Sequence, residues 1–199
     1  MTRSLPEISP PSSPLFLAGH RALDFLNSRM RLKGELVDFF QRDQDVLRWL
    51  RLAGFSAPAK APALEPSSAL LHAARKLREN VRGLVEARKA GHKGNVALLN
   101  SFLAGAPSHP RVVWNAPRSV RVDRVRTLDT AEAILAPVAE AAADFLATAD
   151  FALVKRCEDE TCVFWFVDQT KSHHRRWCSM ALCGNRNKVA AYRKRARRK

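Results

Sequence analysis

CEDETC at residues 157–162 and CSMALC at residues 178–183 hold the four cysteines of this chain of 199 residues. Each cysteine is separated from its neighbour in the segment by four residues. Short loops of this kind bring two thiolates to one edge of a tetrahedron, and Zn²⁺ prefers a tetrahedron of such ligands. A unit of about 45 residues buries too little apolar surface to fold unaided, whereas zinc binding contributes on the order of 10 kcal/mol. The pattern therefore predicts one structural zinc ion, bound by Cys157, Cys162, Cys178 and Cys183.

Other uses of the cysteines are alternatives to zinc. Two disulfides would suit a secreted protein, but the Pro- and Ser-containing N-terminus lacks the apolar segment of a signal peptide. An iron–sulfur cluster is a further alternative. Four unrelated buried cysteines are disfavoured because all four fall within the window 157–183. Zinc remains the leading prediction.

Basic side chains are concentrated toward the C-terminal end of the sequence. The chain has 34 Lys and Arg against 19 Asp and Glu, a formal net charge of +15. Residues 151–199 hold 13 basic and four acidic side chains, and no acidic residue follows Asp168. Such a segment repels itself unless it meets an anion. A polyanionic partner is therefore expected, with DNA the first to consider.

Apolar spacing along most of the chain is helical. Helices are expected near residues 20–32, within 38–54, and at 67–89, 95–103 and 129–146, the last with a possible kink at Pro137. Residues 111–126 alternate apolar with polar side chains around a turn at 116–119, which predicts a β-hairpin. A strand over 163–167 and a helix from Ser179 to the C-terminus complete the pattern. The expected fold class is α+β and mostly α-helical.

These elements divide the chain into three expected units. Residues 1–14, rich in Pro and Ser, indicate a flexible leader. Residues 15–150 are expected to form a helical domain with a β-hairpin, and residues 151–199 a small zinc-bound finger that ends in a basic helix. Glu140 and Asp144 interrupt the longest apolar helical stretch, so no membrane span is expected. Without a signal peptide, we expect a cytoplasmic, nucleoid-associated protein.

The string RRWCSMALCGNRNK at residues 175–188 closely resembles the bacterial CGNR zinc-finger family, which is named for the tetrapeptide at 183–186. Cys157, Cys162 and residues 166–170 also stand where that family's pattern expects them. Upstream, LDFLN at residues 23–27 is similar to the opening motif of the ABATE domain that usually precedes the finger. The resemblance implies a stress-related transcription regulator, with zinc on the four cysteines and DNA as its partner.

Several basic side chains are candidates for contact with nucleic acid. Arg175 and Arg176 precede the third cysteine and could clamp phosphates bidentately. Arg186 could bridge the two acceptors of a guanine base edge. Along the expected helix, Arg193 and Arg197 share a face with Arg186, and the neighbouring Lys188 adds charge. A solvated helix end that adds only nonspecific attraction is the alternative for the residues from Arg193 onward.

A small-molecule pocket in the N-terminal domain is a further hypothesis. His20, Asp24 and Asn27 fall on or near one helical face and could line such a pocket, making the domain a sensor for an effector. The alternative is that Asp24 and Asn27 satisfy backbone groups. A ligand that favoured one arrangement of the two domains would shift DNA affinity.

The leading function is a zinc-dependent DNA-binding transcription regulator. The alternatives are an RNA-binding protein and a protein-interaction module that use the same finger. A homodimer is plausible because one finger has a small footprint. An enzyme is not expected: a nuclease would need an activated water, and Asp168 is the only carboxylate near His173 and His174. With four cysteines present, neither histidine is needed as a metal ligand.

Overall fold

The computed structural model describes residues 13–32, 34–59, 62, 64, 66–105 and 107–196. The expected leader at residues 1–14 lies almost entirely outside these residues, and so does Arg197. The described part of the chain is α+β and mostly helical, as the sequence predicts. None of its helices is both long and apolar enough to cross a membrane.

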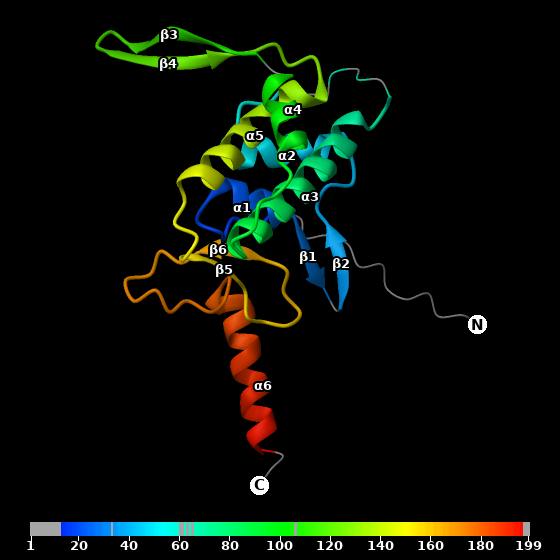
Figure 1. Cartoon of the computed structure of the whole chain (residues 1–199), viewed down its shortest axis with the longest axis vertical. Helices are drawn as coiled ribbons and strands as arrows, with labels where there is room; N and C mark the ends of the chain where they lie inside the picture. The colour runs from blue at the N-terminus through cyan, green and yellow to red at the C-terminus, as the bar shows by residue number, and fades with distance from the viewer. Residues whose placement is uncertain are drawn as a thin grey trace, which may run out of the picture.

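Helices form the body of the molecule, with the long pair α3 (Ala69–Lys89) and α5 (Ala131–Thr148) packed side by side (Figure 1). Apolar side chains recur along α3 at spacings of three and four residues, so one face is buried. Thr130 begins α5 because its hydroxyl accepts a hydrogen bond from the Ala133 amide. Pro137 lies inside α5, where it removes one backbone hydrogen bond.

The shorter helices complete the core. They are α1 (Arg21–Leu26), α2 (Asp43–Leu52) and α4 (Ala97–Ala104). The fully buried residues Leu23, Leu77 and Ile134 come from α1, α3 and α5 and belong to the same apolar cluster. Burial of this continuous apolar surface is the main stabilising contribution to the body.

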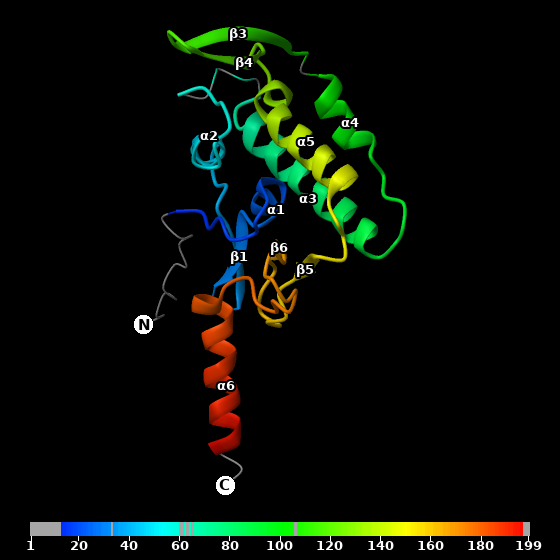
Figure 2. The ribbon, with the colours of Figure 1, turned by 90° about the vertical axis from the view of Figure 1, so that its left-hand side faces the viewer.

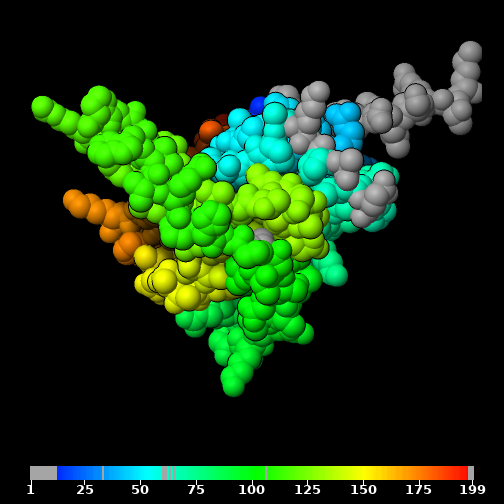
Figure 3. All heavy atoms as spheres, turned by 90° about the horizontal axis from the view of Figure 1, so that it is seen from above, coloured from blue at the N-terminus to red at the C-terminus, as the bar shows by residue number. Residues whose placement is uncertain are grey.

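Two elements project from this body at opposite ends (Figures 1 and 2). The antiparallel hairpin β3 (His109–Ala116) and β4 (Ser119–Val125) confirms the predicted hairpin and stands out from the body in Figure 3. At the other end α6 (Asn185–Ala196) extends away from the rest of the molecule. A short π-helical turn, η1 (Met180–Gly184), precedes α6.

The expected helix over residues 20–32 is wrong in its second half. The structure ends α1 at Leu26 and forms the antiparallel hairpin β1 (Arg29–Leu32) and β2 (Glu35–Asp38). Asn27 ends the helix because its side chain pairs with the distant backbone of Trp165. Met30 of β1 packs beside the cysteines.

Strand β6 (Trp165–Val167) pairs with β5 (Val154–Arg156), which sequence analysis missed. The expected strand over 163–167 is confirmed in its second half. Side chains alternate along it: Phe164 and Phe166 pack with the cysteines, whereas Trp165 belongs to the core of the helical body. This alternation follows from the two-residue period of a strand. The cysteine region is therefore continuous with the body through β6.

Candidate metal centre and basic surface

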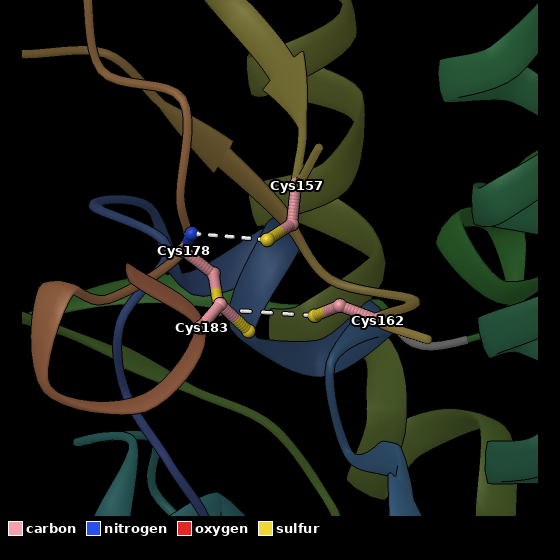
Figure 4. A group of neighbouring side chains, drawn as sticks. All are labelled: Cys157, Cys162, Cys178 and Cys183. Carbon is pink, nitrogen blue, oxygen red and sulfur yellow. Dashed lines mark hydrogen bonds between the residues drawn. The ribbon is translucent and has the colours of Figure 1, made fainter. Parts of the chain in front are cut away.

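The four cysteine side chains point toward one another (Figure 4), and their sulfurs all lie within 4.8 Å of one another. The Sγ atom of Cys178 lies 3.8 Å from that of Cys162 and 3.5 Å from that of Cys183. Four sulfurs around Zn²⁺, each at about 2.3 Å, would be about 3.8 Å apart. The spacing therefore fits one tetrahedral zinc ion. It is far longer than the roughly 2.05 Å of a disulfide, and all four cysteines are free.

Hydrogen bonds from Cys162 and Cys178 lower the pKa of the Cys157 thiol, but burial disfavours ionised thiols at Cys178 and Cys183 in the absence of a cation. Burial raises the pKa of Cys183 to about 12, because desolvation penalises the thiolate. The pKa of Cys178 is also raised, by its hydrogen-bonded neighbours Cys157 and Cys162 and by burial. A divalent cation would reverse this balance and hold all four groups as thiolates. The donor set thus suits a structural zinc ion with no open position for water.

The first pair of ligands is shaped by Asp159. Its Oδ1 atom accepts hydrogen bonds from the backbone amide of Thr161 at 2.9 Å and from the Thr161 hydroxyl at 2.6 Å. The Cys162 amide donates to the Asp159 carbonyl at 2.8 Å. These bonds fold residues 157–162 into a tight loop that brings Cys157 and Cys162 together.

The second pair lies on the turn that leads into α6. Ser179 caps η1, its hydroxyl accepting from the Leu182 amide and its carbonyl accepting from the Gly184 amide. A Cβ atom at Gly184 would lie 2.7 Å from the Met180 sulfur, so a larger residue would not fit without movement. The Cys178 amide donates to the Cys157 sulfur at 3.3 Å, a bond drawn in Figure 4 that links the two pairs.

The tetrapeptide at 183–186 and the next residue, Asn187, are bound to the first loop. Arg186 donates from Nε to Asp159 Oδ2 at 2.9 Å, and Asn187 donates from Nδ2 to the same oxygen. Arg186 also donates from Nη2 to the Cys183 sulfur at 3.3 Å. Asp159 is only 5% exposed, so both partners satisfy a buried carboxylate. Sequence analysis missed this role of Asp159, although its position between the first two cysteines was a usable signal.

Asp168 is a second carboxylate whose role was missed. It is fully buried, and its two oxygens accept from the Lys155 ammonium at 2.7 Å, the Thr170 hydroxyl at 2.6 Å and the Arg175 amide at 2.8 Å. These contacts fix the loop that leads to the third cysteine. His173 contacts the Asp168 carbonyl, and neither it nor His174 belongs to the metal-binding group.

Arg175 and Arg176 differ in how many contacts their side chains make within the protein. The Arg175 guanidinium donates to the carbonyls of Leu17, Trp177 and Cys178 and stacks on Phe166 with 4.2 Å to the ring centroid. Arg176 is exposed and pairs with Glu158 at 2.5 Å. Phosphate contact by either residue stays a prediction, but for Arg175 it would compete with these bonds.

The basic side chains of α6 have different surroundings. Every α6 residue except Asn187 is exposed, and none is buried. Within the described part of the chain, no ion pair or hydrogen bond holds the side chains of Lys188, Arg193, Lys194 and Arg195. The apolar side chains of α6 are also exposed, Val189 by 48% and Tyr192 by 68%. The helix therefore presents uncompensated positive charge to solvent.

The three candidate pocket residues all contact backbone groups. His20 Nδ1 accepts from the Ala22 amide at the start of α1, and Asp24 Oδ1 accepts from the Ala18 amide at 3.0 Å. Asn27 pairs with both the amide and the carbonyl of Trp165, at 3.0 and 2.8 Å. The alternative in which Asp24 and Asn27 satisfy backbone groups agrees with these contacts. A ligand pocket formed by the three residues stays a prediction.

Known protein families match both halves of this architecture. The ABATE family model, described as "Putative stress-induced transcription regulator", matches residues 19–149, and the CGNR zinc finger model matches residues 154–196. A search of curated proteins found no match. The second model spans the four cysteines, so the metal predicted from their spacing and geometry is the zinc of a CGNR finger. The chain therefore belongs to the ABATE family and carries a CGNR zinc finger.

Proposed function

We propose that this chain regulates transcription by binding DNA through α6. The observation that carries the proposal is the contrast between the two ends of that helix. Its first turn is bound to Asp159 beside the metal centre, whereas the rest exposes basic side chains that have no ion-pair partner in the described chain. A fixed helix of this charge offers a polyanion a surface that is held in place and already uncompensated.

The dimensions of α6 suit the major groove of DNA. Its 12 residues extend over about 18 Å, and a helix of about 10–12 Å diameter fits a groove about 12 Å wide. In Figures 1 and 2 the helix projects away from the body, which would leave its faces open to the groove. Lys188, Arg193, Arg195 and, beyond the described residues, Arg197 would supply phosphate contacts.

Arg186 would have a supporting role in this complex. Its guanidinium already pairs with Asp159 and donates to the Cys183 sulfur, although about half of the side chain remains exposed. A base contact by Arg186 would have to share or replace these bonds. We therefore assign direct DNA contact first to the exposed residues of α6 and to Arg176, and helix positioning to Arg186.

The test compares two sets of substitutions that each remove three positive charges. One carries Lys188→Gln, Arg193→Gln and Arg195→Gln on α6, and the control carries Arg48→Gln, Lys76→Gln and Arg118→Gln at exposed sites of α2, α3 and the β3–β4 turn. Loss of three phosphate contacts should weaken binding at least tenfold and reduce the logarithmic salt slope by about 3. The control should bind almost like the wild type. Equal losses in both sets would show that only net charge matters.

Selection of bound fragments from genomic DNA and from cellular RNA distinguishes the function classes. A regulator should enrich a DNA motif, because its affinity for a specific site exceeds its affinity for nonspecific DNA by about a thousandfold or more. Enrichment of RNA alone would favour the RNA-binding alternative. Zinc-loaded protein that enriches neither would favour a protein-interaction module.

Control by a small-molecule effector, a homodimer and nucleoid association are further parts of this hypothesis. A homodimer would place two fingers on DNA and add specificity. The hairpin β3–β4 exposes Val112, Trp114, Val120 and Val122 on one of its faces. Sedimentation of the zinc-loaded chain over a range of concentrations tests whether it dimerises.

A further inference from the structure

A cavity of about 540 Å³ lies where the β3–β4 hairpin meets the body. Figures 1 and 2 show the hairpin at the opposite end of the molecule from α6. The cavity walls come from the hairpin, from the segment after α2 and from α5. The volume falls within the roughly 300–1,000 Å³ of small-molecule sites. This cavity shares no residue with the candidate pocket at His20, Asp24 and Asn27.

Positive charge exceeds negative charge around the cavity. Four arginines line it against two carboxylates, and each carboxylate is already paired. Arg121 binds Asp123 through two hydrogen bonds of 2.7 and 3.0 Å, and Arg126 pairs with Glu140 at 2.8 Å. Of the two remaining arginines, Arg124 donates to the Ser108 hydroxyl at 2.8 Å and lies, by the strand register, on the opposite face of the hairpin from Arg111. Arg111 stands opposite Asp123 in the register but forms no ion pair with any residue that the structure describes. An anion is therefore the missing counter-charge.

Arg126 shows that part of the cavity wall is buried as well as charged. Its side chain is only 7% exposed, and its buried Nε–H has no hydrogen-bond partner within the described residues. A buried guanidinium with an unmet donor is unfavourable unless another group compensates it. Nearby, Phe55, Leu128 and Pro137 supply an apolar wall. A ligand with an apolar body and an anionic group would complement both features.

We propose that this cavity binds a small molecule that carries a carboxylate or phosphate group on an apolar body. Arg111 supplies the unpaired charge for the anion, and the wall formed by Phe55, Leu128 and Pro137 takes the apolar part. The proposal concerns ligand binding alone, so it stands whether or not α6 binds DNA.

Calorimetric titration of the full-length, zinc-loaded protein tests the chemistry of the ligand. The probes are 2-naphthoate, 2-naphthyl phosphate, the neutral 2-naphthalenemethanol and inorganic phosphate. At least one anionic naphthalene should bind, and the neutral alcohol and inorganic phosphate should each bind at least tenfold more weakly. The stronger of the two anions identifies the headgroup. Failure of both anionic naphthalenes to bind, or equal binding of the alcohol, would overturn the proposal.

Substitutions on the same hairpin locate the binding site. Arg111→Gln should weaken binding of the anionic probe about tenfold, whereas Arg118→Gln, at the hairpin turn and outside the cavity, should leave it unchanged. Arg111 is exposed, so its loss should not prevent folding. Equal effects of the two substitutions would exclude the cavity. If the triple α6 variant lost probe binding, the anion would bind to the finger and not to the cavity. Because this variant is also the one used to test DNA binding, failure of the cavity proposal can be distinguished from failure of the DNA-binding proposal.

Discussion

The metal centre and α6 are adjacent in sequence but use their charged side chains in opposite ways. Around the cysteines, Arg175 and Arg186 are bonded to carbonyls, to a carboxylate and to sulfur within the protein. On α6, Arg193 and Arg195 are exposed and unpaired within the described chain. The difference teaches that basic residues near a metal site are not equivalent: some stabilise the fold, and others remain available to a partner.

Zinc removal should have the largest effect, because the metal joins the two cysteine loops, and the second of these loops leads into α6. We expect Cys178→Ser or a chelator to cost on the order of 10 kcal/mol of finger stability and to release α6. Metal analysis and trypsin digestion check this, since Lys171, Arg175 and Arg186 should become cleavable while α3 and α5 stay protected. A metal-free finger that resists trypsin would contradict the structural role of zinc.

Asp159→Ala should have the next largest effect, because it removes the acceptor that Arg186 and Asn187 share. Loss of this buried carboxylate should destabilise the finger by about 3 kcal/mol and weaken zinc binding about tenfold to hundredfold. Zinc competition with a chromophoric chelator measures the change. Glu158→Gln is the matched control, since Glu158 pairs with Arg176 on the surface. If both variants retain zinc equally well, Asp159 has no special role.

Asn27→Ala tests how firmly the metal side is joined to the body. It leaves the amide and the carbonyl of Trp165 without their buried partner and should cost about 2 kcal/mol. Urea unfolding gives the free energy, with Asn100→Ala on the exposed face of α4 as the control. A change no larger than the control would mean that β6 does not depend on Asn27.

Asp24, which accepts a hydrogen bond from the Ala18 amide, should make the free energy of unfolding depend on pH. Burial raises its pKa to about 6 from the ordinary 3.8, so the folded state binds this proton more tightly than the unfolded state. The stabilising contribution is therefore present below about pH 4 and is lost as pH rises to about 6. Between pH 5 and pH 7, wild type should lose about 1 kcal/mol relative to Asp24→Asn. If the free energies of unfolding of wild type and Asp24→Asn, measured with urea, changed in parallel with pH, the raised pKa of Asp24 would be contradicted.

The exposed charges of α6 should have the smallest effect on stability. Arg193→Gln with Arg195→Gln should change the free energy of unfolding by no more than about 0.5 kcal/mol, because no described residue pairs with either side chain. The same urea experiment used for Asn27→Ala checks it. A loss of stability comparable to that of Asp159→Ala would show that these side chains make stabilising contacts in the folded protein. The contrast between the paired arginines at the metal centre and the unpaired arginines of α6 would then be wrong.

Local patterns were sufficient for much of the fold and for the metal ligands. The spacing of the cysteines predicted the four ligands, and helical periodicity predicted α3 and α5. They were insufficient at residues 27–38, because the end of α1 depends on a hydrogen bond between Asn27 and Trp165, which are 138 residues apart. Strand β5 was missed because a strand of three residues has too little periodicity to detect.

The sequence by itself determined which atoms can bind the metal, because thiolates on short loops can meet with little help from the rest of the chain. It also determined the excess of positive charge at the C-terminal end. Only the tertiary structure decided which of those charges are free. Whether a guanidinium is paired depends on what lies opposite it in space, and for Arg186 that group is Asp159, 27 residues earlier in the chain.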